Sequence, residues 1–502
     1  MSTAQVPGSS RHSVFHGALK GTGLYSIPLV IQRVASIFLL SITTRILSSD
    51  DFGMLSLLEQ VSAVLAILLC GMFSSALGYF YFRKDMEGRR GEVVGTAVWG
   101  SFLLGAAAGL ICWPAMGILA RVVFRNPDAL RYLPIVFVFM PFGFGVEALL
   151  GWLRVEDRQA VFVRASLLRV ALVVLGVGVL VGLLKIRIMA YLATTLFSSA
   201  AVSAVLIVYL FRRLRPTISF SLFAQMFRFS LPLGFSMIAM FVINFGDQFV
   251  LRHYKSLGEV GIYALGYKIG MIVSVPYGSL HAYWAAQVYK ILGREDGETV
   301  FTRLFTYTVL LVTSVALALT LGSAPGLRIL VASKFWAAIP LIPVIAGAYA
   351  IRSVGEFLRC RFLAAGRPGY EPVCTWTGMA ACVALYFILI PRIGMWGGAI
   401  ATLGTFLLMG VISVVATYRL SPYRVEGLRL LKIGGVSAAI LILFYAVPVS
   451  SLVLQIGWCS LLLALFPAGL WALRFATPGE LAALRSAAQR IGRWRQGVAE
   501  AQ

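Results

Sequence analysis

The segment FSLPLGFSMIAMFVINFGDQFVL, residues 229–251, is apolar along its length except for one ionisable side chain, that of Asp247. Roughly 20 apolar residues are enough to cross the hydrocarbon core of a bilayer as an α-helix, so the segment predicts a membrane-spanning helix. Arg252 follows directly, which leaves Asp247 about 7.5 Å from the helix end at 1.5 Å per residue. A carboxylate at that depth costs less than one at the midplane, and we expect it to serve an ion site or a gate.

The composition of the whole chain agrees with this segment. Hydrophobic residues make up 59% and charged residues 13% of the 502 positions, whereas soluble domains carry about 25% charged residues. The net charge of +23 comes from arginines in short loops between apolar runs, which favours contact with lipid headgroups over nucleic acid binding. The six cysteines and four histidines lack metal-ligand spacing, so the sequence predicts neither a metal nor another cofactor.

Apolar runs recur along the chain and predict an all-α integral membrane protein with about 14 transmembrane helices. We place them at residues 22–45, 54–80, 93–120, 132–153, 161–184, 188–211, 229–251, 261–288, 304–327, 338–358, 373–391, 394–417, 430–449 and 452–474. Lys and Arg are concentrated on the side that holds both termini, which predicts a multi-pass protein with cytoplasmic termini. The external connections leave no room for a catalytic domain, so we expect a protein that is not an enzyme.

An internal repeat with offsets of 204 to 209 residues divides the chain. SIPL at 26–29 recurs as SLPL at 230–233, Gly53 matches Gly261, and Glu147 matches Glu356. Six helices in each half make these parallel repeats, related by an axis along the membrane normal, with a substrate path between them. The predicted parts are a cytoplasmic segment (1–21), two six-helix bundles (22–216 and 217–422), an extra helix pair (423–476) and a basic amphipathic tail on the cytoplasmic leaflet (477–502).

Three stretches of the chain resemble a known family. INFGDQFVLRHYKSLGEVGIYALGYKI at 243–269 resembles the seventh and eighth helices of Wzx-type oligosaccharide flippases. SIPLVIQRVASIFLLSITTRILSSDDFGMLSLLEQV at 26–61 resembles their N-terminal pair, and RIGMWGGAIATL at 392–403 the opening of their twelfth helix. These flippases belong to the MOP superfamily, together with the MATE drug exporters and the lipid II flippase MurJ. The resemblance covers roughly residues 20–420 and implies the MATE/MOP-like fold.

The resemblance also implies a function. Flippases of this family move an undecaprenyl-pyrophosphate-linked oligosaccharide, such as an O-antigen or other surface polysaccharide repeat unit, across the bacterial inner membrane. The expected partners are this lipid-linked oligosaccharide, membrane lipids and other polysaccharide-assembly proteins. Alternating access would be driven by an ion or proton gradient, since the sequence contains no GxxxxGK[ST] phosphate loop. A lipid II-type flippase and a MATE-like cation or drug antiporter remain as alternatives.

Ionisable side chains inside the predicted spans are the candidate site residues. A desolvated pyrophosphate needs cationic partners, ideally a bidentate guanidinium. The candidates for substrate binding are Arg33, Lys268, Arg352 and Arg169. The candidates for an ion site, a proton site or a gate are Asp247, Glu59, Glu147 and Glu356. Arg33 is the deepest of the eight, and we expect it to hold the pyrophosphate.

Several of these residues have a structural alternative. Arg169 and Lys268 would reach a membrane surface by snorkelling if they do not face a cavity. Arg352 lies four residues before Glu356, so an i,i+4 ion pair would neutralise both.

The sequence also suggests partners for the candidate gates. Lys268 is the expected partner of Asp247, and Glu59 with Gln60 would complete an outer gate with Lys268. The loop arginines expected to pair with Glu147 and Glu356, and so to close an inner gate, are Arg154, Arg158 and Arg361.

Overall fold

The computed structural model describes residues 38–476, apart from 70–72, 183–186, 293–294, 366, 368 and 421–424. Among these residues all regular structure is helical and there is no strand, which confirms the all-α fold class. Arg33, most of the predicted span 22–45, the segment 1–21 and the tail 477–502 lie outside the described residues.

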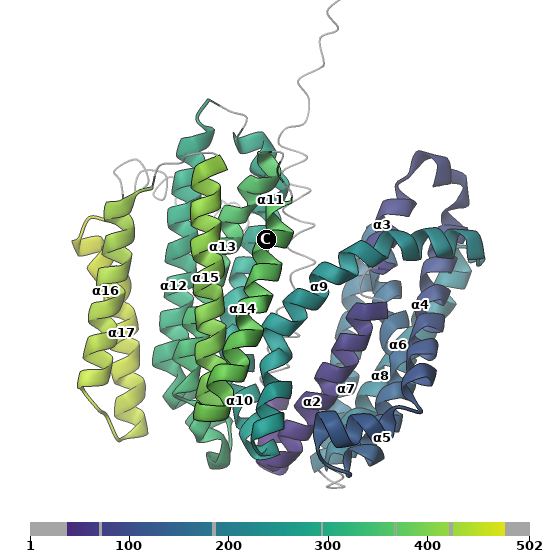
Figure 1. The fold of residues 1–502 in the computed structure, drawn as a ribbon, viewed down its shortest axis with the longest axis horizontal. Coiled ribbons are helices and arrows are strands. Elements are labelled where there is room, and N and C mark those ends of the chain that lie inside the picture. The colour runs from purple at the N-terminus through teal and green to yellow at the C-terminus, as the bar shows by residue number, and fades with distance from the viewer. Residues whose placement is uncertain are drawn as a thin grey trace, which may run out of the picture. The chain divides into compact units, whose positions relative to one another are not determined.

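Figure 1 shows the helices, coloured from purple near the N-terminus to yellow near the C-terminus. In the first half of the chain they are α2 (Ser49–Leu69), α3 (Phe73–Tyr81), η1 (Lys84–Arg89), α4 (Arg90–Cys112), α5 (Met116–Leu119), η2 (Ala120–Phe124), α6 (Ala129–Val155), α7 (Gln159–Gly182) and α8 (Arg187–Arg213). In the second half they are α9 (Phe220–Tyr254), α10 (Leu257–Gly270), η3 (Met271–Val273), α11 (Ser274–Leu292), α12 (Gly297–Leu330), η4 (Ser333–Ala338), α13 (Leu341–Ala364), α14 (Tyr370–Ile393), α15 (Met395–Leu420), α16 (Gly427–Ala446) and α17 (Leu452–Ala472).

Eleven helical stretches within the described part of the chain are long and apolar enough to cross a membrane. They include α6, which continues through Pro134 and Pro141. Prolines are tolerated inside membrane helices because neighbouring groups satisfy the freed carbonyls. The chain is therefore a multi-pass membrane protein, while the count of fourteen spans stays a prediction.

The helix that contains Asp247 is longer than its apolar segment. α9 begins at Phe220 rather than at residue 229, because the Ser219 side chain caps it by accepting a hydrogen bond from the Leu222 amide at 3.4 Å. The extra turns are held by aromatic contacts, such as that of Phe223 with Phe73 at 5.4 Å between ring centres. Hydropathy does not detect an added stretch of this kind because it carries polar residues.

The chain divides into two compact units. Unit 1 comprises residues 1–265, 330–338 and 375–401, and unit 2 comprises 266–329, 339–374 and 402–502. The predicted boundaries at residues 216 and 422 follow the sequence repeat instead, and they stay a prediction.

In unit 1, α6 packs along both α4 and α8, and a buried cluster around Trp152 fills the space between these helices. Small residues set the spacing: a Cβ at Gly105 would lie 2.6 Å from the Pro141 Cα, and one at Gly109 would lie 2.8 Å from the Phe137 carbonyl oxygen. Close backbone approach of this kind is how membrane helices gain packing contacts.

In unit 2, the C-terminal helices α16 and α17 pack against each other and against α12. The buried side chains at this contact include Leu317, Ile433, Ile440, Leu462 and Phe466.

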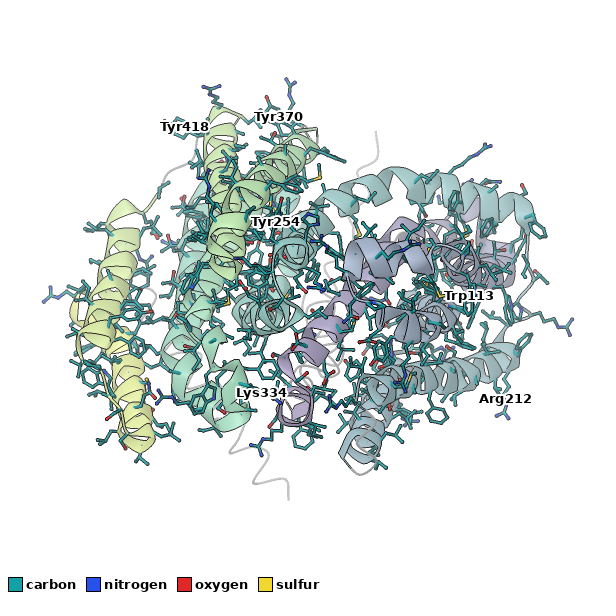
Figure 2. All side chains as sticks on the ribbon, turned by 60° about the horizontal axis from the view of Figure 1, so that its bottom comes forward. Trp113, Arg212, Tyr254, Lys334, Tyr370 and Tyr418 are labelled. Atoms are coloured by element: carbon teal, nitrogen blue, oxygen red, sulfur yellow. The ribbon has the colours of Figure 1, made fainter. Side chains whose placement is uncertain are left out.

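Exposed aromatic side chains lie at helix ends. Figure 2 labels Tyr370 at the start of α14 and Tyr418 near the end of α15, and both rings are exposed. Tyrosines in such positions are typical anchors at a membrane–water interface.

Candidate functional site

Asp247 lies in a fully buried polar cluster of unit 1. The Tyr263 hydroxyl of α10 donates a hydrogen bond to Asp247 Oδ2, and the Gln248 amide donates to Oδ1 at 2.8 Å. Beside it, the Ser56 hydroxyl of α2 donates to Gln248 Oε1 at 2.7 Å. Helices α2, α9 and α10 are therefore joined by side-chain hydrogen bonds around a carboxylate. Such a carboxylate is a candidate proton or ion site because polar groups within a membrane mark functional positions.

Tyr263 was not predicted as a partner of Asp247. The two lie 16 residues apart on successive helices, a separation that no helical periodicity connects. Lys268 lies near the end of α10 with an exposed side chain, and its pairing with Asp247 stays a prediction.

Glu59 also accepts a hydrogen bond from a tyrosine of unit 1. The Tyr191 hydroxyl of α8 donates to Glu59 Oε1 at 3.1 Å. A tyrosine donor stabilises a carboxylate within apolar surroundings without adding a positive charge. Both Asp247 and Glu59 thus have neutral donors in unit 1.

Glu147 pairs with Arg169, and this corrects the expected pairing with the loop residues Arg154 or Arg158. Arg169 Nη1 lies 2.8 Å from Glu147 Oε1 and connects α7 to α6. The side chain of Glu147 is 58% exposed and that of Arg169 25%. The positive charge of Arg169 is therefore balanced by a carboxylate on the neighbouring helix.

Arg352 and Glu356 form the ion pair that their four-residue spacing predicts. Arg352 Nε lies 2.8 Å from Glu356 Oε1 on α13, and the guanidinium lies 5.5 Å from the centres of the Tyr349 and Phe406 rings. The two aromatic rings stabilise the cation through their π faces. The pair is polar, mostly buried and located within a predicted span of unit 2.

Arg359, which was not among the predicted site residues, extends this pair into a network. Its side chain is 5% exposed, with Nε 2.8 Å from Glu371 Oε2 and Nη2 3.9 Å from Glu356 Oε1. Its Nη1 donates to the Ser413 hydroxyl at 3.3 Å. Hydropathy placed Arg359 just beyond the predicted helix end at residue 358, whereas α13 continues to Ala364. The sequence signal for this contact is that Arg359 follows Glu356 by three residues, a spacing that makes the two side chains neighbours on a helix.

Arg361 binds a different carboxylate from the one predicted. It donates two hydrogen bonds to the Glu298 carboxylate, at 2.9 and 2.7 Å, and its guanidinium lies 4.4 Å from the centre of the Phe301 ring. The expected pairing of Arg361 with Glu356 is wrong, because the last turns of α13 direct it toward the start of α12. The described residues contain no cluster of three or more His, Cys, Asp or Glu side chains that could hold a metal ion.

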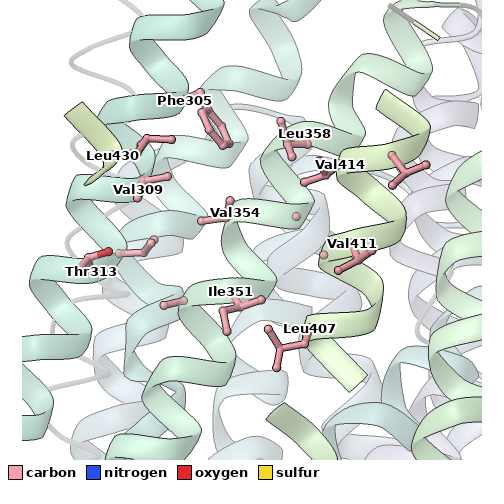
Figure 3. Close-up of a pocket in the computed structure, with 15 residues that line it drawn as sticks. Phe305, Val309, Thr313, Ile351, Val354, Leu358, Leu407, Val411, Val414 and Leu430 are labelled. Atoms are coloured by element: carbon pink, nitrogen blue, oxygen red, sulfur yellow. The ribbon is translucent and has the colours of Figure 1, made fainter. Parts of the chain in front are cut away.

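Unit 2 also contains an apolar cavity of about 510 Å³ between α12, α13, α15 and the start of α16. Figure 3 shows its labelled side chains, which are all hydrocarbon except for Thr313. Val411 and Val414 on its rim are 58% and 44% exposed, so the cavity opens on an apolar surface of unit 2. Its lining can hold a flexible hydrocarbon chain but offers almost no hydrogen-bonding group.

The sequence and the fold both have known relatives. The family model described as "Polysaccharide biosynthesis protein" matches residues 18–282, more than half of the chain. The chain belongs to this family. A comparison with curated proteins found no match.

Solved structures similar to this family member show the fold. Lipid II flippase MurJ in an inward closed conformation matches with a TM-score of 0.73 and 14% identity, over 90% of this chain and 100% of that one. An inward-facing MATE multidrug resistance transporter gives 0.65 and 19%, over 80% and 98%. A MOP superfamily transporter from Pyrococcus furiosus gives 0.58 and 18%, over 80% and 96%. The predicted MATE/MOP-like fold is confirmed.

Proposed function

We propose that this protein is a flippase. It moves an undecaprenyl-pyrophosphate-linked oligosaccharide, an O-antigen or other surface polysaccharide repeat unit, from the cytoplasmic to the periplasmic face of the bacterial inner membrane by alternating access. The observation that carries the proposal is membership of the polysaccharide biosynthesis family combined with a MurJ-like fold. Sugars and a pyrophosphate cannot enter hydrocarbon without losing their hydration, so their transfer needs a protein that supplies polar partners.

Paired arginines support an anionic substrate. Arg169 and Arg352 each have a carboxylate partner at 2.8 Å, so each pair is neutral before substrate binds. A pyrophosphate that approaches such a pair can replace the carboxylate as the partner of the guanidinium, because Arg binds phosphate oxygens in the same bidentate geometry. Arg33 and Lys268 complete the proposed set of substrate-binding residues.

The apolar cavity of unit 2 supports a lipid-linked substrate. Its rim valines are exposed on the surface of unit 2, and its aliphatic lining offers close packing to an isoprenoid chain. Packing rather than water exclusion drives association within a bilayer. The lipid tail can therefore stay in the hydrocarbon while the glycan passes through a polar path.

The four carboxylates have proposed roles in coupling and gating. Asp247 and Glu59 accept tyrosine hydrogen bonds, and we assign them to a proton or ion site. Glu147 and Glu356 pair with arginines, and we assign them to an inner gate. Substrate binding at Arg169 or Arg352 would release the gate carboxylate, which couples occupancy to opening.

Deletion of the gene, followed by complementation, tests the proposal. We expect the deletion strain to lose surface polysaccharide and to accumulate lipid-linked repeat units on the cytoplasmic face. Complementation with the wild-type gene should restore export. Complementation with Arg164→Ala should also restore it, because this arginine lies at an exposed position on the same helix as Arg169 and is not a proposed site residue. Normal polysaccharide combined with raised sensitivity to cationic drugs would favour the MATE-like alternative, and accumulation of lipid II would favour the lipid II alternative.

Exchanging the charges of the Arg352–Glu356 pair on α13 distinguishes a substrate-binding role of Arg352 from a structural one. Arg352→Ala should abolish export, because the guanidinium is lost. Arg352→Glu combined with Glu356→Arg keeps an ion pair at the same spacing, yet it moves the cation four residues along the helix, about 6 Å. We expect the swapped protein to reach the membrane at wild-type levels and still not export. Restored export would mean that the pair has only a structural role.

A further inference from the structure

Helix α11 packs along α13 in unit 2 and places a histidine beside the Glu356 carboxylate. The imidazole of His281 has its Nε2 3.6 Å from Cys360 Sγ, and it interacts electrostatically with Glu356. One turn along α11 from His281, the ring of Trp284 stacks on that of Phe357 of α13, with their centres 4.8 Å apart. This contact fixes the separation of the two helices, so the histidine is held close to the ion pair of α13.

Tyr277, one turn before His281 on the same face of α11, has a buried hydroxyl without a hydrogen-bond partner among the described residues. Its side chain is 2% exposed, and its ring centre lies 5.5 Å from that of His281. It also interacts electrostatically with Glu356 and Cys360. A buried hydroxyl without a partner is unfavourable. Its position near a carboxylate therefore points to a second state in which the two groups are bonded.

The network around Glu356 has no net charge while His281 is neutral. Arg352 and Arg359 supply two positive charges, and Glu356 and Glu371 supply two negative ones. Histidine is the side chain that most readily changes its charge near neutral pH. The ring of His281 is half-buried rather than enclosed, so a proton can reach it. One added proton gives the network a net positive charge, which favours an anionic ligand.

The other elements in contact with α11 bring charge through one ion pair in the described part of the chain. η3 has no titratable residue. α12 contacts α11 where Phe301 meets Trp284, and Glu298, one turn earlier on α12, is bound by Arg361. The charged groups that face His281 are therefore those of the α13 network.

We propose that His281 is a proton-binding site that controls the partner of Glu356. A proton from water adds to the free ring nitrogen of the neutral imidazole. The Cys360 contact fits both forms, because the thiol can donate to Nε2 or accept from an Nε2–H group. The imidazolium and the Tyr277 hydroxyl then take the Glu356 carboxylate from Arg352. The guanidinium of Arg352 becomes available to an anionic group.

This exchange specifies the class of ligand. Arg352 loses its carboxylate but keeps the flanking rings of Tyr349 and Phe406, so its guanidinium stays oriented. Such a group binds phosphate oxygens in a bidentate geometry. Because linkage between two ligands is reciprocal, binding of a pyrophosphate draws a proton onto His281. The inference rests on the proposed function, which supplies the pyrophosphate.

Titration of the histidine signals by NMR tests the site without any substrate. The chain has four histidines, and the ring signal that is missing in His281→Gln is that of His281. Its titration midpoint should differ between the wild type and Glu356→Gln, because the carboxylate interacts with the charge of the imidazolium. Glu426→Gln, which removes the carboxylate paired with Arg429, is the control and should leave the midpoint unchanged. Equal midpoints in all three proteins would overturn the proposal.

Calorimetry counts the proton directly. Farnesyl pyrophosphate, a short isoprenoid pyrophosphate, is titrated into the protein in micelles at about pH 8, in two buffers with different ionisation enthalpies. The wild type should take up about one proton more per bound molecule than His281→Gln, and it should bind more tightly. Glutamine keeps a hydrogen-bonding side chain but does not titrate, and protons exchanged by the ligand itself cancel in the difference. Equal proton uptake would contradict the proposal.

Tyr277→Phe separates the two states. In the present structure the hydroxyl has no partner among the described residues, so its loss should leave the midpoint of unfolding in denaturant unchanged. The proton-loaded state loses a donor to Glu356, so the affinity for farnesyl pyrophosphate should fall about fivefold. A loss of stability with unchanged affinity would show that Tyr277 is only structural and would contradict its proposed role.

The NMR and binding measurements separate the proton site from the proposed function. A midpoint that responds to Glu356→Gln, in a protein that does not bind farnesyl pyrophosphate, would support the proton site and contradict the flippase proposal. Binding of the pyrophosphate with a midpoint that does not respond would support the flippase proposal and contradict the proton site.

Discussion

Two pairs of positions that match in the sequence repeat differ in how alike their surroundings are. The caps of α2 and α10 and the glycines that follow them have matching contacts. Glu147 and Glu356, which also match in the repeat, have different surroundings: the first has one arginine partner on another helix, and the second lies between Arg352 and Arg359. A contact between the two copies constrains both together, whereas charged side chains with separate partners can change independently.

The largest expected effect is that of Glu356→Gln. Removing this carboxylate breaks the ion pair with Arg352 and removes a contact of Arg359 in a mostly buried network. Breaking a buried ion pair costs about 3–5 kcal/mol. Unfolding titrations in mixed micelles should show a loss of this size. A loss below that of the Glu147→Gln variant would contradict the contrast between the two carboxylates.

Tyr263→Phe should have the next largest effect on stability. It removes the hydroxyl that donates to Asp247, which is fully buried, and losing one partner of a buried hydrogen bond costs about 1–3 kcal/mol. The same unfolding assay measures the loss. Tyr267→Phe is the control on the same helix, since the Tyr267 hydroxyl accepts a hydrogen bond from another neutral group, the Tyr349 hydroxyl, at 3.1 Å.

The caps of α2 and α10 should respond alike to mutation, because their serines match in position and in contact. Ser48→Ala and Ser256→Ala each remove a helix N-cap, at a cost of about 1 kcal/mol. The same unfolding assay should show losses of similar size for the two variants. Clearly unequal losses would contradict the equivalence of the two caps.

The smallest expected effect is that of Glu147→Gln on stability. The Glu147 side chain is 58% exposed, and exposed ion pairs contribute about 0–1 kcal/mol. The variant should therefore unfold almost as wild type does. Its export rate is the informative measurement, because an unpaired Arg169 would bind the anionic substrate before the inner gate has responded.

The sequence predicted the helices well where hydropathy alone decides them. The runs of α6 and α14–α17 lie within a few residues of the predicted spans, because a bilayer requires each helix to be apolar and about 20 residues long. The start of α9 at Phe220 and the end of α13 at Ala364 were missed. Both extensions carry polar residues that tertiary contacts keep helical.

Side-chain contacts were predictable from the sequence where both residues lie on one helix at a regular spacing. The Arg352–Glu356 pair follows from helical periodicity. The Arg361–Glu298 pair, the Tyr263–Asp247 hydrogen bond and the reciprocal contacts of Gly53 and Gly261 join different helices. The repeat showed that Gly53 and Gly261 match, but only the fold brings their backbones together.

The most direct test of the flippase proposal is a transport measurement in proteoliposomes that contain an undecaprenyl-pyrophosphate-linked oligosaccharide. A glycan-binding reagent added outside should capture nearly all of the substrate when wild-type protein and an ion gradient are present. With Arg352→Ala or without protein, it should capture only the outer-leaflet fraction. Capture of that fraction alone by active wild-type protein, in vesicles that still accumulate a cationic drug, would contradict the account.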